Sequence, residues 1–128
     1  MMDVEGAEVR LTMPASPPLL RVARLTAAGL AGRLGFSLDE IEDTKIAVDE
    51  LCFAVVGSRG RSGTLTLVYR LGRDHLTIEG RGAFEVALPA PAPNELSSKI
   101  LAVVADEHEL SSGPGATWFR LLKRGGRG

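Results

Sequence analysis

The sequence predicts a two-layer α/β (α+β) sandwich, in which about three helices cover one face of a mostly antiparallel, mixed sheet. Apolar residues recur at every second position in some segments and at three- and four-residue spacing in others. These segments follow the order strand, helix, helix, strand, strand, helix, strand, and packing the helices on one face of a single sheet is the economical way to bury them. The 128 residues suggest one domain, 1–124, followed by a loose tail, 125–128.

The first strand and the first helix are separated by prolines. The stretch 7–15 alternates, which places Val9, Leu11 and Met13 on one face of a strand. Pro18 is well placed to open a helix over 18–35, and Gly35 is a natural stop. The apolar stripe expected for this helix is Leu19, Val22, Ala23, Thr26, Leu30 and Leu34.

The second helix begins with a capping box and ends near Val56. Ser37 can accept a hydrogen bond from the amide of Glu40, whose side chain reaches back to the amide of Ser37. Glu50 lies on a different stripe from the core positions, among small and apolar neighbours such as Ala47 and Ala54. The expected core stripe is Ile41, Thr44, Val48, Leu51 and Val55.

The second half of the chain predicts a hairpin, a helix and a closing strand. Strands at 64–71 and 75–80 flank a short turn. The proline-rich stretch 89–93 should be extended, and Asn94 is a plausible cap for a helix over 94–107. A turn at 111–115 and a strand at 116–123, with Trp118 as a core residue, complete the prediction.

Composition excludes several functional classes. With 45% hydrophobic and 24% charged residues and a net charge of −1, the chain lacks the basic excess that nucleic acid or an anionic membrane requires. No apolar run approaches the roughly 18 residues of a membrane span, and the amino terminus has no signal-peptide pattern, so we expect a cytoplasmic protein. Cys52 is expected to be a buried packing residue, and His75 and His108 show no metal-ligand spacing, so no metal site is predicted.

Three stretches together resemble the anti-sigma factor serine/threonine kinases of the RsbW and SpoIIAB type, within the GHKL (Bergerat) superfamily of ATPases. They are the paired helices "LLRVARLTAAGLAGRLGFSLDEIEDTKIAVDE", the hairpin that leads into "IEGRG", and the end "LAVVADEHELSSGPGATWFRLLKR". The resemblance covers about residues 8–124 and is closest to divergent actinobacterial members. It implies the fold of that superfamily and a role in transcription regulation during the stress response.

The resemblance assigns chemistry to the second helix, where the family carries E-x-x-x-N. Glu50 matches the glutamate, which acts in the family as the base that activates the substrate hydroxyl. Ala54 stands where the family has an asparagine that ligates Mg²⁺. An alanine methyl has no lone pair, whereas magnesium requires oxygen ligands. The Mg²⁺ that accompanies ATP in the family would therefore lack one protein ligand here.

Two further nucleotide motifs of the family are altered. Gly80 and Gly82 match the glycines of D-x-G-x-G and would contact ATP, but Ile78 replaces the aspartate that binds adenine. The glycine loop before the last helix is absent. The serines and lysine at 97–99 are either an anion contact at the helix start or an ordinary polar first turn. The nucleotide chemistry is therefore predicted to be eroded.

The resemblance also implies partners. Arg24 matches the first-helix arginine that contacts both the sigma factor and the STAS-domain anti-anti-sigma protein, and Arg21 lies one turn earlier. The family is typically dimeric, so a homodimer is expected. Three hypotheses follow: a partner-switching anti-sigma factor for a sigma-B or sigma-F type sigma factor, an active kinase that phosphorylates a serine of the STAS partner, or a regulator that senses another ligand in the vestigial pocket.

Overall fold

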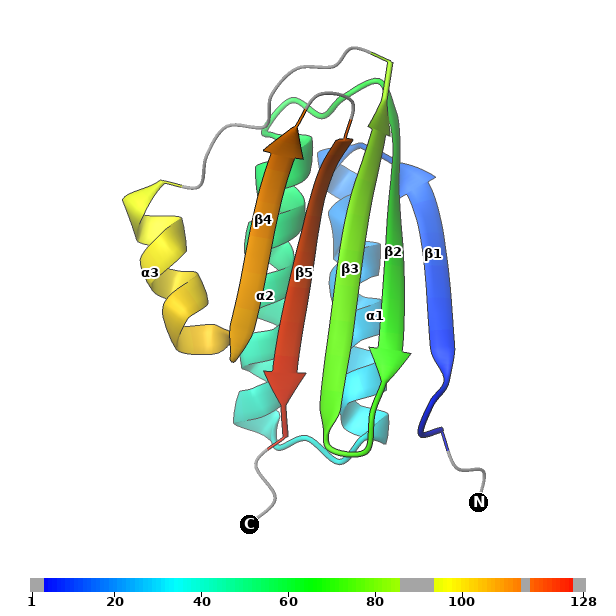
Figure 1. The fold of residues 1–128 in the computed structure, drawn as a ribbon, viewed down its shortest axis with the longest axis vertical. Helices are drawn as coiled ribbons and strands as arrows, with labels where there is room; N and C mark the ends of the chain where they lie inside the picture. The colour runs from blue at the N-terminus through cyan, green and yellow to red at the C-terminus, as the bar shows by residue number, and fades with distance from the viewer. Residues whose placement is uncertain (1–3, 86–93, 114–115, 126–128) are drawn as a thin grey trace.

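The computed structural model describes residues 4–85, 94–113 and 116–125. Five strands form one sheet in the order β1-β2-β3-β5-β4, and all four pairings are antiparallel, where a mixed sheet was expected. Helices α1 and α2 lie side by side behind this sheet, and α3 lies beyond the β4 edge next to α2 (Figure 1). The predicted two-layer α+β sandwich is confirmed. The strands are β1 (Glu8–Pro14), β2 (Gly63–Leu71), β3 (His75–Phe84), β4 (Glu107–Gly113) and β5 (Ala116–Arg124).

The helix layer begins with a short 3-10 turn, η1 (Pro17–Leu19), followed by α1 (Leu20–Arg33). The inward face of α1 differs from the predicted stripe, because Leu19 and Val22 are 37% and 41% exposed. The hydroxyl of Tyr69 on β2 donates to the carbonyl oxygen of Ala23 at 2.9 Å and joins α1 to the sheet. The buried residues of α1 are Leu20, Ala23, Ala27 and Ala31. Because three of these four side chains are methyl groups, α1 can approach the sheet closely.

Helix α2 (Leu38–Val56) follows the sequence prediction closely. Ser37 accepts from the amide of Glu40 at 3.1 Å, and the amide of Ser37 donates to the Glu40 carboxylate at 2.8 Å, which completes the capping box. The fully buried side chains of this helix pack in the core. They include Thr44, Val48, Leu51 and Val55 of the predicted stripe.

The last third of the chain differs most from the prediction. Helix α3 (Glu95–Val104) ends three residues before the expected limit at 107, and the stretch that follows is an additional edge strand, β4. Ser111 belongs to this strand and pairs with Trp118, so the turn predicted at 111–115 is wrong for its first residues. The predicted extended stretch 89–93 lies outside the described residues.

Trp118 is not a core residue, because the phase of β5 is opposite to the one expected. Phe119 and Leu121 are fully buried beneath the helices, whereas Trp118 and Arg120 face the other side of the sheet and remain partly exposed. Gly125, expected in the tail, is buried and donates its amide to the carbonyl oxygen of Asp74 at 2.7 Å. Among the described helices, none is long and apolar enough to span a membrane.

Candidate functional site

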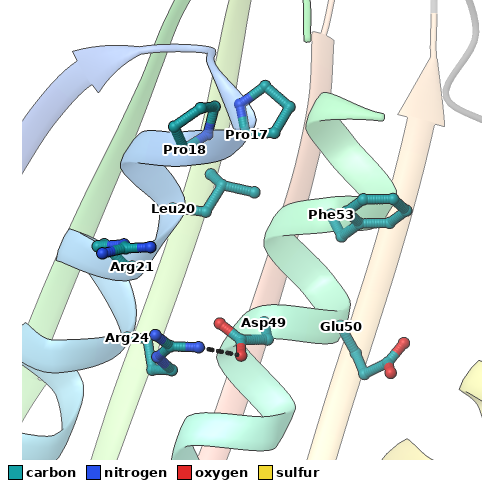
Figure 2. A pocket seen from close by; sticks show the side chains of 8 residues that line it. All are labelled: Pro17, Pro18, Leu20, Arg21, Arg24, Asp49, Glu50 and Phe53. Atoms are coloured by element: carbon teal, nitrogen blue, oxygen red, sulfur yellow. Dashed lines mark hydrogen bonds and ion pairs between the residues drawn. The ribbon is translucent and has the colours of Figure 1, made fainter. Parts of the chain in front are cut away.

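A groove of about 350 Å³ lies on the helix layer, between the first turns of α1 and the last turns of α2 (Figure 2). The two helices run antiparallel, so that the start of one meets the end of the other. Arginine side chains come from α1, carboxylates and an aromatic ring come from α2, and η1 closes one end. The lining residues are Pro17, Pro18, Leu20, Arg21, Arg24, Asp49, Glu50 and Phe53.

Arg24 and Asp49 form an ion pair across this groove. The guanidinium Nη1 lies 3.1 Å from the Asp49 carboxylate, and the two side chains are 36% and 42% exposed. Arg21 lines the same groove one turn earlier, and no described residue pairs with its charge. The structure thus brings together the two arginines predicted to bind a partner. Asp49 was not singled out from the sequence, although its position one residue before Glu50 on a helix could have placed it beside α1.

Glu50 belongs to the margin of the groove and is directed toward α3. Its carboxylate accepts a hydrogen bond of 2.7 Å from the Ser97 hydroxyl, and this contact is partly buried. Ser97 is fixed in turn, because its amide donates to the Asn94 side chain at 2.7 Å in the helix cap. Ser97, considered from the sequence as an anion contact, therefore meets a carboxylate of its own chain.

Ala54, which stands where the family has its magnesium-binding asparagine, has no side-chain oxygen atom. Ala54 lies one turn after Glu50 on α2 and presents only a methyl group. Within the described parts of the chain, no cluster of three or more histidine, cysteine, aspartate or glutamate side chains is arranged to hold a metal ion. The side chain at position 54 therefore has no oxygen atom to offer a Mg²⁺ ion.

The positions matched to the adenine and phosphate motif lie inside β3 rather than in a loop. Ile78 is fully buried and pairs with Tyr69 and Leu121 in the neighbouring strands. The aromatic ring of Phe119 fills the space beside Gly80, and a Cβ atom added there would collide with it. In the same way the ring of Phe84 covers Gly82. Side chains of this chain thus occupy the space at both glycines.

Cys52 is fully buried on the inner side of α2, as the sequence predicted. Burial raises the pKa of its thiol well above the ordinary range, and the nearby Asp49 carboxylate acts in the same direction. Because the thiolate is the nucleophilic form, this cysteine contributes packing and no nucleophile to the site.

Comparison with known proteins finds similarity to serine-protein kinases named RsbW. The chain is 42% identical over 71 residues to the serine-protein kinase RsbW of Halalkalibacterium halodurans, which covers 55% of this chain and 44% of that protein. It is 38% identical over 73 residues to RsbW of Bacillus cereus and 37% identical over 73 residues to RsbW of Bacillus mycoides, covering 56% of this chain and 46% of each relative.

The chain matches about half the length of these curated relatives. No protein-family model matches it. Over the matched stretch, the chain is similar to serine-protein kinase RsbW, which confirms the resemblance that its motifs indicated.

Proposed function

We propose that this protein is a partner-switching anti-sigma factor of the RsbW type. It sequesters an alternative sigma factor of the sigma-B or sigma-F class and releases it when a STAS-domain anti-anti-sigma protein competes for the same surface. The observation that carries the proposal is the groove that Arg21 and Arg24 line from α1 and the exposed ring of Phe53 lines from α2. The similarity to RsbW supports the class of partner.

The side chains of this groove suit capture of a protein segment. Arginine and aromatic residues supply much of the binding energy at protein interfaces. Phe53 is 51% exposed, and the Arg24 guanidinium is shared with only one carboxylate oxygen of Asp49. A segment that carries a carboxylate next to an apolar side chain would satisfy both features at once.

The nucleotide chemistry of the family is weak in this chain, and we propose little or no ATP turnover. Phosphoryl transfer depends mainly on metal ions that neutralise charge and position the phosphates. The methyl group of Ala54, the buried alkyl chain of Ile78 and the ring over Gly80 support this view. The Glu50 carboxylate, in addition, already accepts a hydrogen bond from Ser97.

The alternative function is an active protein-serine kinase. The observation in its favour is Glu50, which occupies the position of the family's base and lies partly buried at the α2–α3 contact. Titration with ATP and Mg²⁺, followed by transfer of labelled phosphate to a purified STAS protein from the same genome, separates the two. Stoichiometric transfer that is lost in Glu50→Gln would replace our proposal with the kinase.

The capture proposal is tested with each sigma factor of the source genome, purified singly and titrated into this protein by calorimetry. We expect one sigma factor to bind and the variant Arg24→Glu to weaken that binding by about tenfold or more. Arg33→Glu is the matched control, because Arg33 is exposed on the same helix outside the groove. Absence of binding by every sigma factor, or equal losses in both variants, would refute the proposal.

A further inference from the structure

Glu50 takes part in two neighbouring structures at once. Its side chain lines the groove between α1 and α2, and its carboxylate accepts a hydrogen bond of 2.7 Å from the Ser97 hydroxyl of α3. Figure 2 shows the carboxylate directed away from the Arg24–Asp49 pair. Glu50 is therefore positioned to meet both α3 and a molecule that occupies the groove.

The first turn of α3 is held to the rest of the molecule by little else. The side chains of Leu96 and Ser98 are exposed, and that of Ser97 is partly buried. The Asn94 cap and the ion pair of this turn lie within α3 itself. Among the described residues, no hydrogen bond or ion pair other than Ser97–Glu50 joins this turn to another element.

The second half of α3 is anchored differently. Leu101 and Val104 are buried in the core, with 1% and 6% of their surface exposed, and Ile100 packs against the same cluster. Burial of aliphatic side chains on this scale stabilises more than one hydrogen bond does. We therefore expect the first turn of α3 to open before the second half, because its local free energy of opening is lower.

A cationic side chain is the strongest competitor of Ser97 for Glu50. The serine hydroxyl donates one hydrogen bond to one carboxylate oxygen, whereas a guanidinium can donate to both oxygens and also neutralises their charge. Phe53, which lines the groove and is 51% exposed, follows Glu50 by three residues on α2. Residues three apart on a helix are neighbours, so a cation seated over this ring lies within reach of Glu50.

We propose that Glu50 couples the groove to α3. A groove occupant that presents an arginine or lysine to Glu50 takes the carboxylate from Ser97 and releases the first turn of α3. The coupling is reciprocal, so release of this turn raises the affinity of the groove for such an occupant. The inference takes the groove of the proposed function as its binding site, but its test needs no sigma factor, so the two can fail separately.

The variant Phe53→Arg supplies the competing cation from within the chain. The new guanidinium pairs with Glu50, and we expect amide hydrogen exchange at Ser97 and Ser98 to accelerate about twofold, measured by NMR. Both amides report on this turn, because they donate to Asn94 in the helix cap. Phe53→Met is the matched control, since it removes the ring and adds no charge, and it should exchange at the parent rate.

A double-variant cycle with Ser97→Ala shows whether the coupling passes through the Ser97–Glu50 hydrogen bond. Ser97→Ala removes this bond by itself, so Phe53→Arg should cause no further acceleration at residue 98 when Ser97→Ala is already present. Circular dichroism checks that every variant folds. An acceleration by Phe53→Arg that persists in the Ser97→Ala protein, or equal exchange in Phe53→Arg and Phe53→Met, would overturn the inference.

Discussion

The two sides of α2 differ, although their key residues are neighbours in the chain. Asp49 faces α1 and pairs with Arg24, whereas Glu50 turns toward α3 and accepts a hydrogen bond from Ser97 (Figure 2). Successive residues of an α-helix are about 100° apart, so adjacent carboxylates reach different neighbours. The Arg24–Asp49 pair lines the groove between α1 and α2, whereas the Glu50 carboxylate is bound by a residue of α3.

Under the proposed function, this difference separates partner recognition from phosphoryl chemistry on a single helix. The Arg24–Asp49 side lies over a groove, and its ion pair is more than one third exposed. The Glu50 side continues to the methyl group of Ala54. If the proposed function holds, α2 keeps a binding surface on one side while the adjacent stripe lacks the asparagine oxygen that the family uses.

Leu51→Ala should produce the largest effect, because it removes the support shared by both sides. Leu51 is fully buried on the inner face of α2, and shortening it leaves a cavity. We expect a loss of about 3 kcal/mol in the free energy of unfolding, measured by urea denaturation. Leu38→Ala is the control, since Leu38 is 82% exposed and should change stability little. Equal losses in the two variants would show that α2 does not pack on the sheet as described.

Exchanging the charges of the groove should break recognition while the fold remains. In the double variant Arg24→Asp with Asp49→Arg, the ion pair can re-form with its direction reversed. We expect unfolding free energy within about 0.5 kcal/mol of the parent but sigma-factor binding at least about tenfold weaker, by urea denaturation and calorimetry. Parent-like binding in the exchanged protein would mean that the groove serves only to join the helices.

Ser97→Ala tests the other side of α2. The lost hydrogen bond joins α3 to a partly buried carboxylate, so we expect a loss of about 1 kcal/mol in stability. Amide hydrogen exchange in α3 should accelerate as well. Ser98→Ala is the matched control, because Ser98 is exposed on the same turn. If both variants exchange at the parent rate, the Ser97–Glu50 contact contributes nothing to holding α3.

Asp49→Asn should give the smallest change. An ion pair with this exposure contributes roughly 0–1 kcal/mol, and salt screens part of it. We expect a small loss of stability that disappears at 1 M salt, measured by thermal melting at several ionic strengths. A loss above about 2 kcal/mol, or one independent of salt, would assign Asp49 a buried structural role.

Local chemistry explains why much of the fold could be predicted. The capping box at Ser37 and Glu40 fixes the start of α2 through hydrogen bonds within one turn, so it can be read directly from the sequence. Strand β4 escaped prediction because Leu110 is the only large apolar residue in its seven, and its pairing with β5 supplies the order. The phase of β5 was also ambiguous, since Trp118 and Phe119 are adjacent aromatic residues and only their neighbours across the sheet decide between them.

The candidate site was predictable only in part, for a similar reason. Motif resemblance pointed to Glu50, Arg21 and Arg24, and the structure places all three around one groove. The motif resemblance did not point to Asp49, because its ion pair with Arg24 depends on how α1 and α2 pack against each other. The rings beside Gly80 and Gly82 were likewise unpredictable, because Phe84 and Phe119 reach the glycines through side-chain geometry and strand pairing.

The Tyr69 hydroxyl joins the sheet and the helix layer by a hydrogen bond. Tyr69 lies in β2 between Val68 and Arg70, whose side chains point away from the helices. Its hydroxyl donates to the Ala23 carbonyl oxygen of α1 at 2.9 Å. Arg24 is the next residue after Ala23, so the hydrogen bond that ties α1 to the sheet lies within one residue of the side chain proposed to hold a partner.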